Sequence, residues 1–337
     1  MRADRAPDGL RLRVALLLGV LLVALVPLQG QAAPREAGPR LETPRAVLDD
    51  AVRCPQRLTR KTVLLVHGTS VTADENWGWS WVEALPREGF DVCTVEMPDR
   101  LLVDIQRTSE YVVHAIRTVA RRSGHRISVV GLSQGALQPR WALRFWPDLP
   151  RLVDDYVSMA GTNRGTVFAD AACAGGSCLA SLWQQRTSGS AFQAVLNSGD
   201  TTPGDVSYTS VYSLTDEIIQ PVAPVPVAMI EGATNIAVQD VCPGRYVGHV
   251  QSIADATYYA VVMDALTHRG PADPLRVDRH SCSQTFMPHV DPVEAAIRTA
   301  EVYVTAGVVQ SHYQKVPAEP PLRPYARGAT GAGRRAS

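Results

Sequence analysis

The sequence predicts an α/β fold with a mostly parallel central sheet and helices on both of its faces. Two observations support this prediction: short apolar segments typical of buried strands recur along the chain, and segments of helical periodicity separate them. The length of 337 residues, with 45% hydrophobic side chains, is ample for one sizeable core. We therefore expect one folded domain over residues 33–316, followed by a tail at 317–337 that is rich in Pro, Arg and Gly.

The expected strands and helices alternate after a polar, proline-containing lead-in. Apolar runs mark the strands, because strands that are buried on both faces are apolar throughout. They cover residues 62–66, 91–96, 127–132, 152–160, 210–214 and 225–230. Apolar side chains at helical spacing mark the main helices, which cover residues 105–121, 251–266 and 292–309.

The balance of charges argues against a nucleic-acid-binding protein. The 33 basic side chains are matched by 33 acidic ones, and the basic ones, almost all arginine, are scattered along the chain. A nucleic-acid-binding domain would instead show a basic surplus gathered in one patch. We expect no nucleic-acid partner.

The N-terminus has the pattern of a secretory signal peptide. Arginines precede an apolar run from Val14 to Val26 that is too short to span a bilayer as a helix. Pro27 ends this run, and the small residues around Ala32 suit signal peptidase. We expect residues 1–32 to be removed after Ala32 and the mature protein to be secreted, without a stable membrane anchor. An uncleaved anchor is the alternative.

The cysteines fit an exported protein. Their number is six, and an even number in such a protein favours three disulfides, although the sequence alone leaves the pairing open. Cys173 and Cys178 could form half of a zinc site, but no histidine cluster at metal-ligand spacing accompanies them. We therefore expect disulfides and no metal.

The most informative segment is Gly131-Leu132-Ser133-Gln134-Gly135, which lies between an apolar strand and a helical pattern. A serine at such a sharp strand-to-helix turn has strained backbone geometry, and side chains two positions before and after it would collide unless both residues were glycine. The turn lifts the serine hydroxyl above the carboxyl edge of the sheet, where the following helix N-terminus favours a developing negative charge. These features predict Ser133 as a nucleophile; the alternative is a plain turn.

An acid and then a histidine should follow this serine along the chain, each at the carboxyl end of a strand. Asp216 comes just after an expected strand, and His249 lies in a loop between a strand-like segment and a helix. Their joint order favours them over other downstream candidates, any of which taken alone is typical of a surface or loop. Those candidates are Asp200, Asp205, Asp240, His268, His280, His289 and His312.

The loop after the first strand is the expected source of an oxyanion donor. Gly68 lets the backbone turn there, and Thr69 offers both an N–H group and a hydroxyl. His67 precedes the nucleophile in the chain, so we assign it a structural role rather than that of a base.

The elbow and three further segments resemble those of the secreted α/β-hydrolase lipases of the Candida antarctica lipase B family. The resemblance covers about residues 45–327. It implies the α/β-hydrolase fold, a triad of Ser133, Asp216 and His249, and oxyanion donors from Thr69 and Gln134. The matching segments, which keep their order and spacing, are Ser133-Gln134-Gly135, Ser181-Leu182-Trp183-Gln184-Gln185, residues 212–221 around Thr215-Asp216-Glu217-Ile218, and Pro324-Tyr325-Ala326-Arg327.

The resemblance also implies a disulfide pattern and a substrate pocket. The family's disulfides correspond to Cys54–Cys93 and Cys242–Cys282. Cys173 and Cys178 would then form a short ring, in which two glycines supply the free dihedral angles that a tight ring needs. The side chains expected to line the pocket are Leu132, Thr162, Gln185 and Ile218.

Three departures from the family concern substrate scope rather than reaction type. Leu132 stands where the resembled lipase carries a tryptophan in its alcohol pocket, and Thr162 stands where it has an aspartate. Cys173 and Cys178 fall in the segment that corresponds to its short lid and have no counterpart there.

We therefore expect a secreted, monomeric serine lipase or esterase that cleaves carboxylic esters, in particular acylglycerols at an oil–water interface, without a cofactor. The alternatives are an esterase for short or polymeric esters with the same chemistry, and a secreted binding module that keeps the fold without activity. In the resembled family, a helix at residues 292–309 lines the mouth of the site. The apolar stripe of this segment is by itself more typical of core packing, and it comprises Val293, Ile297, Ala300, Val304 and Val308.

Overall fold

The computed structural model describes residues 38–328, which contain a seven-stranded sheet in the order β1-β3-β2-β4-β5-β6-β7. Only β1 is antiparallel to its neighbour, and all other pairs are parallel. The predicted fold class is thereby confirmed. The strands are β1 Val52–Arg53, β2 Thr62–Val66, β3 Asp91–Val95, β4 Ile127–Leu132, β5 Val153–Met159, β6 Ser207–Tyr212 and β7 Thr234–Ala237.

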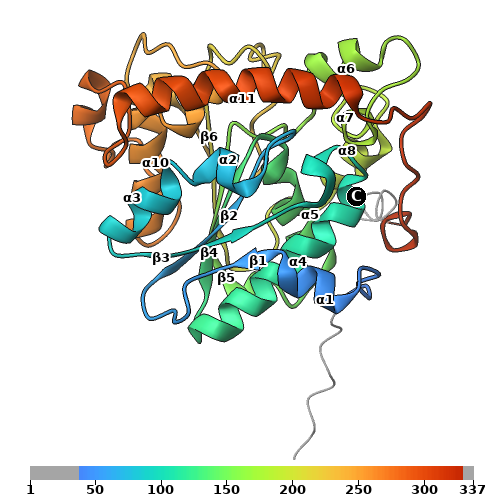
Figure 1. Cartoon of the computed structure of the whole chain (residues 1–337), viewed down its shortest axis with the longest axis horizontal. Helices are drawn as coiled ribbons and strands as arrows, with labels where there is room; N and C mark the ends of the chain where they lie inside the picture. The colour runs from blue at the N-terminus through green and yellow to red at the C-terminus, as the bar shows by residue number, and fades with distance from the viewer. Residues whose placement is uncertain (1–37, 329–337) are drawn as a thin grey trace, which may run out of the picture. The chain divides into compact units, whose positions relative to one another are not determined.

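Helices cover both faces of this sheet (Figure 1). Alternate residues of β2 point to opposite faces, so Leu64 and Val66 join one hydrophobic cluster while Val63 and Leu65 join the other. The first cluster contains side chains of α1 Arg45–Asp50, α4 Ile105–Ser123, α5 Leu137–Phe145 and α8 Ala191–Leu196, and the second those of α3 Trp81–Arg87, α9 Val238–Val241 and α10 Ala256–Thr267.

The elements nearest the carboxyl ends of the strands are short, apart from one long helix. The short helices there are α2 Ala73–Trp77, α6 Val167–Cys173 and α7 Ala180–Trp183, with 3₁₀ turns at η2 Ser133–Ala136 and η4 Val250–Ile253. The long helix is α11 Pro292–His312, which crosses above α2 in Figure 1. The remaining 3₁₀ turns are η1 Pro98–Leu101, η3 Pro150–Leu152, η5 Arg279–Ser283 and η6 Pro324–Ala326.

One expected strand was wrong. Residues 225–230 form turns rather than a strand, and the last strand is β7, which follows at Thr234–Ala237. The apolar run contains Pro226 and follows Pro221 and Pro224. Each proline removes a backbone donor that a strand inside a sheet would need.

The apolar stripe expected on the long helix faces solvent. Val293 is 69% exposed and Val304 is 67% exposed, with Ile297 and Val308 also more than half exposed. The stripe therefore packs neither in the core nor in a substrate channel, and a different face of α11 reaches the site described below.

The six cysteines form the expected pairs Cys54–Cys93, Cys173–Cys178 and Cys242–Cys282. The first and third close loops with sequence separations of 39 and 40 residues, and each is worth on the order of 4 kcal/mol in the chain-entropy model. The ring between Cys173 and Cys178 is short, so its contribution in that model is only about 2 kcal/mol.

The described part of the Pro- and Arg-rich segment beyond residue 316 packs against the body of the fold. The Glu319 carboxylate accepts hydrogen bonds from the backbone N–H groups of Ala191 (2.8 Å) and Phe192 (2.9 Å) at the start of α8. The Tyr325 hydroxyl accepts one from Trp141 Nε1 (3.0 Å). The expected signal peptide at residues 1–32 lies outside the described residues. Between residues 38 and 328, no helix combines the length and apolar character that a membrane span requires.

Candidate active site

The candidate nucleophile, Ser133, sits at a strained turn between β4 and α5. Its φ of 55° lies in the left-handed region that side chains other than glycine rarely adopt. The strand β4 is buried throughout, and only four residues separate its end from the start of α5, so the chain must reverse sharply at this serine. Ser133 is 8% exposed.

The two glycines of the elbow have no room for a side chain. A Cβ on Gly131 would lie 2.3 Å from the Gly135 carbonyl oxygen, and one on Gly135 would lie 2.2 Å from the His67 carbonyl oxygen. Both obstacles are backbone atoms, which cannot move away as a flexible side chain could. Close packing within the elbow therefore requires glycine at position 131, and close packing of the elbow against the end of β2 requires it at position 135.

We expect Gly135→Ala to destabilise the fold by about 1–3 kcal/mol, as overpacking of a close-packed site does. Urea denaturation measures the free energy of unfolding. Gly175→Ala is the matched control, because a Cβ at Gly175 would meet nothing within 4 Å. Equal stability of the two variants would contradict the steric argument.

The structure brings Ser133, His249 and Asp216 into one hydrogen-bonded row. His249 Nε2 lies 3.0 Å from Ser133 Oγ, and His249 Nδ1 lies 2.9 Å from Asp216 Oδ2. The other carboxylate oxygen of Asp216 accepts the backbone N–H groups of Ile218 and Ile219, each at 2.8 Å. The aspartate is thus fixed by its own loop and can orient the imidazole toward the serine.

The pKa values of the two titratable groups move apart. Burial acts to raise the pKa of Asp216, but the charge and hydrogen bond of His249, together with the two backbone N–H groups, outweigh it and leave that pKa below its usual value. Burial acts to lower the pKa of His249, but the charge and hydrogen bond of Asp216 and the charge of Glu217 outweigh it and raise that pKa above 6.5. The pair therefore favours an ionised carboxylate beside a readily protonated imidazole.

We expect kcat/KM for ester cleavage to rise with pH through a midpoint above 6.5, because only the neutral imidazole can accept a proton from Ser133. Below the raised pKa of His249 the imidazolium predominates and activity is lost. Glu217→Gln should move the midpoint to lower pH, since Glu217 contributes to raising that pKa. A pH profile that stays flat from about pH 5 to 8 would contradict the assignment of His249 as the base.

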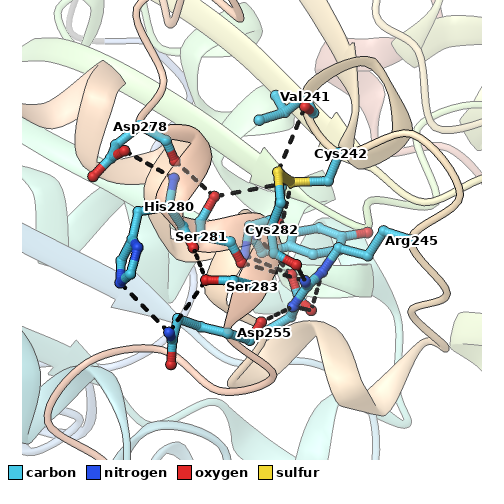
Figure 2. Close-up of a disulfide and its surroundings, with 12 residues drawn as sticks. Val241, Cys242, Arg245, Asp255, Asp278, His280, Ser281, Cys282 and Ser283 are labelled. Atoms are coloured by element: carbon cyan, nitrogen blue, oxygen red, sulfur yellow. Dashed lines mark hydrogen bonds and ion pairs between the residues drawn. A yellow bond between two sulfur atoms is a disulfide. The ribbon is translucent and has the colours of Figure 1, made fainter.

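The loop that carries His249 is anchored at both of its sides. At its start, the Cys242–Cys282 disulfide joins it to η5 (Figure 2). Thr215, which precedes Asp216 in the chain, holds Val247 near the end of the loop. Its Oγ1 accepts the backbone N–H of Val247 (2.9 Å) and donates to the carbonyl of the same residue (3.1 Å). Glu217 accepts the backbone N–H of His249 itself (2.9 Å).

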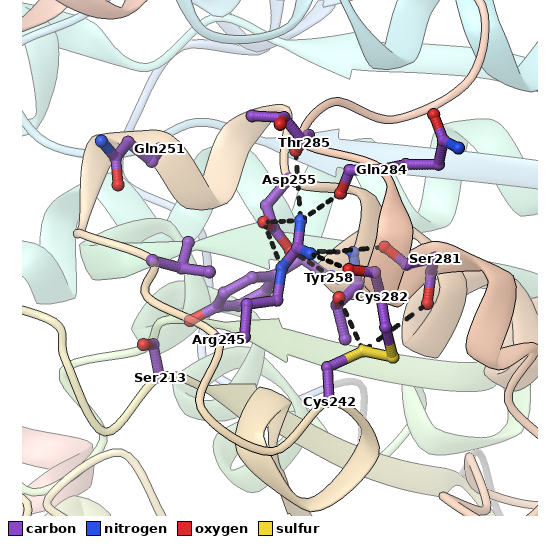
Figure 3. A network of polar contacts seen from close by, with 12 residues as sticks. Ser213, Cys242, Arg245, Gln251, Asp255, Tyr258, Ser281, Cys282, Gln284 and Thr285 are labelled. Carbon is purple, nitrogen blue, oxygen red and sulfur yellow. Dashed lines mark hydrogen bonds and ion pairs between the residues drawn. A yellow bond between two sulfur atoms is a disulfide. The ribbon is translucent and has the colours of Figure 1, made fainter.

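Arg245 holds the middle of this loop (Figure 3). Its guanidinium donates to Asp255 Oδ2 from Nε (2.8 Å) and Nη2 (2.6 Å), and both side chains are almost fully buried. It also donates to four backbone carbonyls, those of Ser281, Cys282, Gln284 and Thr285. Asp255 in turn caps α10 by accepting from Thr257 N and Tyr258 N.

We expect Arg245→Met to destabilise the fold by about 3 kcal/mol or more, because it leaves the Asp255 charge buried without its partner. Adding Asp255→Asn should recover part of this loss, since the amide removes the charge and keeps an oxygen for the cap. Urea denaturation of both variants tests this. An equal loss in the single and double variants would contradict a charge-based clamp.

The expected oxyanion residues lie together beside Ser133. The Thr69 hydroxyl donates to Gln134 Oε1 (2.6 Å), and Gln185 Nε2 donates to the same oxygen (2.9 Å). Thr162 Oγ1 donates to Gln185 Oε1 (2.9 Å), so the two expected pocket residues extend the same row. Gln134 Nε2 is bound to the Leu101 carbonyl (2.9 Å). The Thr69 hydroxyl would have to turn from Gln134 in order to reach an oxyanion.

Thr69, Thr162 and Gln185 line a cavity of about 280 Å³. Ser133 and His249 lie in its wall, together with Leu132, Thr162, Gln185 and Ile218, so all four expected pocket residues contact it. The helix α11 contributes Val302, Tyr303, Ala306, Gly307 and Gln310. The lining is mostly apolar and contains no Asp, Glu, Lys or Arg side chain, which suits a neutral ligand.

The alternative acids and bases lie elsewhere. Asp200 binds the backbone of Thr202, and Asp240 caps the start of α9. His268 pairs with Asp264 and His289 with Glu88. Within residues 38–328, no three or more His, Cys, Asp or Glu side chains are grouped as a metal site would require.

His67 is fully buried and has the structural role that was expected. Its Nε2 accepts the backbone N–H of Met97 (3.0 Å), so its Nδ1–H donates to the Gly68 carbonyl (2.8 Å). Burial lowers its pKa to about 4, and the ring stays neutral at physiological pH.

Three residues near the site were not expected from the sequence to contribute to it: Glu217, Tyr303 and Asn76. Glu217 links His249 to α11, because its other oxygen accepts a hydrogen bond from the Tyr303 hydroxyl. Asn76 from α2 lines the cavity and binds the backbone of Gly68. The sequence could have pointed only to Glu217, because it directly follows Asp216. Tyr303 and Asn76 reach the site through contacts with segments that are distant in the chain.

Comparisons with known proteins agree with this geometry. Residues 60–255 match the family model described as Lipase (class 2). The chain is 30% identical to Lipase B from Pseudozyma antarctica over 315 residues, which covers 90% of this chain and 91% of that protein.

Solved structures show the same fold. Lipase B of Aspergillus fumigatus superposes with a TM-score of 0.80 at 28% identity, covering 88% of this chain and 76% of that chain. The propeptide form of the Bacillus licheniformis lipase BlEst2 has a TM-score of 0.53 at 15% identity over 66% of this chain and 54% of that chain, which supports the fold alone. The chain belongs to the class 2 lipase family, a family of ester-hydrolysing enzymes with the α/β-hydrolase fold.

Proposed function

We propose that this protein is a secreted serine lipase that hydrolyses carboxylic esters through an acyl-enzyme on Ser133. The observation that carries the proposal is the row from Asp216 through His249 to Ser133 Oγ, with hydrogen bonds of 2.9 and 3.0 Å, at the wall of a neutral cavity.

In the first half of the reaction, Ser133 Oγ attacks the ester carbonyl carbon and His249 Nε2 takes the hydroxyl proton. The carbonyl oxygen becomes an oxyanion, which the N–H groups of Thr69 and Gln134 and the Thr69 hydroxyl stabilise. When the intermediate collapses, the carbon–oxygen bond to the alcohol breaks, and His249 gives its proton to the leaving oxygen.

In the second half, a water molecule attacks the acyl-enzyme. His249 takes a proton from the water, the Ser133 ester bond breaks, and the same proton returns to Ser133 Oγ. Asp216 keeps Nδ1 protonated and stabilises the imidazolium in both halves. No metal or organic cofactor takes part in these steps.

Acylglycerols are the proposed substrate class, because apolar side chains are exposed on the two helices nearest the cavity mouth. Val304 and Val308 of α11 are 67% and 55% exposed, and Val167 and Phe168 of α6 are 46% and 40% exposed. Exposed apolar side chains gathered in this way favour contact with a lipid surface. Phe168 also lines the cavity.

One observation favours the second candidate, an esterase for short or polymeric esters. The cavity of about 280 Å³ lies at the small end of the range for ligand sites, so a long acyl chain would extend out of it. The reaction and the residues are the same for both candidates.

Two assays distinguish the lipase from the esterase. One measures hydrolysis of p-nitrophenyl esters with acyl chains from two to sixteen carbons, and the other measures hydrolysis of emulsified triglyceride. The proposal expects hydrolysis of the emulsion and of the longer esters. Activity confined to the shortest soluble esters would favour the second candidate. If the wild-type protein hydrolyses none of these substrates, the remaining candidate is a binding module with a hydrolase fold.

We also propose that the protein is exported after cleavage of residues 1–32 and acts as a monomer. The three disulfides support an oxidising location. Mass spectrometry of protein recovered from culture medium should give an N-terminus near Ala33. A mass that retains the leader would contradict cleavage.

A further inference from the structure

The turn η1, at Pro98–Leu101, has an unusual backbone that the mechanism above does not explain. Asp99, Arg100 and Leu101 have φ values of 53°, 50° and 60°, so three consecutive residues other than glycine lie in the left-handed region. Such conformations persist only where the surrounding structure holds them, and they cluster at functional sites. The contacts of the turn indicate which site it serves.

The turn joins the two segments that supply the proposed oxyanion donors. Just before it, the backbone N–H of Met97 donates to His67 Nε2 (3.0 Å), at the start of the loop that carries Thr69. At its end, the Leu101 carbonyl accepts from Gln134 Nε2 (2.9 Å), beside the nucleophile. Leu101 and Gln134 are both fully buried. A turn that contacts both segments can fix the position of one relative to the other.

Arg100, in the middle of the turn, holds both backbone groups of the residue that follows Thr69. Its carbonyl oxygen accepts the N–H of Ser70 (2.7 Å), and its guanidinium Nη1 donates to the carbonyl of the same residue (3.2 Å). Ser70 is fully buried and has a φ of 73°. Its side chain is bound separately, by Gln310 Nε2 of α11 (3.0 Å). Arg100 thus fixes the backbone on the C-terminal side of Thr69.

Glu75 of α2 fixes the guanidinium in turn. Its Oε1 accepts Arg100 Nη2 at 3.1 Å, and its Oε2 accepts both Arg100 Nη1 and the backbone N–H of Thr72 (2.9 Å). Burial acts to raise the pKa of Glu75, but hydrogen bonds from Arg100 and Thr72 and the charge of Arg100 outweigh it and leave that pKa below its usual value. The ionised carboxylate therefore keeps the guanidinium in place beside Ser70.

The Thr69 peptide lies beside the nucleophile, with its N–H unused. A Cβ placed on Gly68, the preceding residue, would be 3.4 Å from Ser133 Cβ. The N–H of Gly68 donates to Asn76 Oδ1 (2.8 Å), and the N–H of Ser70 donates to the turn. The N–H of Thr69 makes no hydrogen bond within residues 38–328, and Thr69 is partly exposed and lines the cavity. An unused donor between two fixed neighbours is preorganised for a developing oxyanion.

We propose that Arg100 is a positioning residue for ester hydrolysis, which sets the Thr69 N–H at the place where the oxyanion forms. It acts through Ser70 and lies outside the described cavity lining. When the guanidinium is removed, the Ser70 carbonyl loses its donor and the Thr69 N–H shifts. Donors fixed in advance stabilise the transition state more than the substrate, so the shift weakens mainly the former. This inference rests on the proposed function, in which Thr69 supplies an oxyanion donor.

Two ligands of similar shape test the proposal in Arg100→Met. Butyl trifluoromethyl ketone reacts reversibly with an activated serine: Ser133 Oγ bonds to the ketone carbon, His249 takes the hydroxyl proton, and the carbonyl oxygen receives the electron pair and becomes an oxyanion. The corresponding secondary alcohol fills the same space without reacting. The inhibition constants of both compounds are measured, together with kcat/KM for p-nitrophenyl butanoate.

We expect Arg100→Met to lower kcat/KM about tenfold, less than the factor of roughly 10²–10³ that loss of an oxyanion donor costs, because the donor is displaced rather than removed. The inhibition constant of the ketone should rise by the same factor, and that of the alcohol should stay unchanged. Arg100→Lys should give intermediate values, since an ammonium can still donate to the Ser70 carbonyl but lacks the fork that also binds Glu75.

Arg126→Met is the matched control. Arg126 is 34% exposed, close to the 31% of Arg100, and it likewise binds a carboxylate, that of Asp154 (2.8 Å), and a backbone carbonyl, that of Val153 (2.6 Å). It directly precedes β4 and so lies at the amino edge of the parallel strands, away from the site. This variant should leave kcat/KM and both inhibition constants unchanged.

A fall in kcat/KM with an unchanged inhibition constant of the ketone would overturn the inference, because Arg100→Met would then only reduce the amount of active protein. An equal rise in the constants of ketone and alcohol would also overturn it, since the cavity itself would be altered. If Arg100→Met does not fold, wild-type constants in Arg100→Lys would overturn it. A wild-type protein that neither binds the ketone nor hydrolyses the ester would instead overturn the proposed function.

Discussion

Ser133→Ala is expected to lower kcat for ester hydrolysis by a factor on the order of 10⁵ or more, as loss of the nucleophile does in serine hydrolases. The change removes one oxygen atom from a residue that is 8% exposed and leaves the shape of the elbow intact. The rate is measured on a p-nitrophenyl ester with purified protein, so that contaminating esterase can be excluded. Residual activity above about one per cent would contradict the assignment.

Ser133→Gly is the matched control for folding. It is also inactive in this account, but it removes the strain of a side chain at a φ of 55°. We expect its melting temperature to be equal to or above that of Ser133→Ala. Thermal unfolding followed by circular dichroism measures both, and a markedly lower value for Ser133→Gly would show that the turn is not strained.

Asp216→Asn has the second largest expected effect, a fall in kcat on the order of 10⁴. Asn Oδ1 can still accept the backbone N–H groups of Ile218 and Ile219, which bind Asp216 Oδ1. Its NH₂ group would then face His249 Nδ1 and donate to it. That contact places the imidazole proton on Nε2, where the ring can no longer accept the proton of Ser133.

The same kinetic assay and an unfolding curve test this variant. Stability should change little, while activity falls. Near-normal activity would make another carboxylate the acid, yet Asp200 and Asp240 already bind backbone groups elsewhere.

The fold was predictable where the strand signal was local and uninterrupted. The segments 62–66 and 127–132 are mostly apolar and became β2 and β4 with the expected bounds. The segment 225–230 is equally apolar but failed, because nearby prolines prevent ladder hydrogen bonds. The two-residue β1 carries too little sequence to show a periodicity.

The long helix shows a second limit of sequence patterns. The sequence correctly predicts that its apolar side chains form a stripe along one face of the helix. The spacing of these side chains does not show whether that face is buried or exposed. In the structure that face is exposed, and the residues lining the cavity, among them Tyr303 and Gly307, belong to another face. Only the three-dimensional position of α11 over the carboxyl ends of the strands decides which side meets the substrate.

The candidate site was predictable from the order of the three residues along the chain, although His249 follows α9 and a loop rather than the strand-like segment expected before it. Ser133, Asp216 and His249 each lie in a loop near the carboxyl edge of the sheet, and the structure brings them within hydrogen-bonding distance. Asn76 and Tyr303 were not predictable, because neither adjoins a strand end and their roles depend on contacts with Gly68 and Glu217.

Reaction with a fluorophosphonate tests the central claim most directly, because such a probe forms a covalent bond only with an activated serine. We expect one adduct per chain, located on Ser133 by peptide mapping, at a rate that rises with pH through a midpoint above 6.5 as His249 loses its proton. The adduct should be absent from Ser133→Ala and strongly slowed in Asp216→Asn. No adduct on the folded wild-type protein, or an adduct on any residue other than Ser133, would contradict the account.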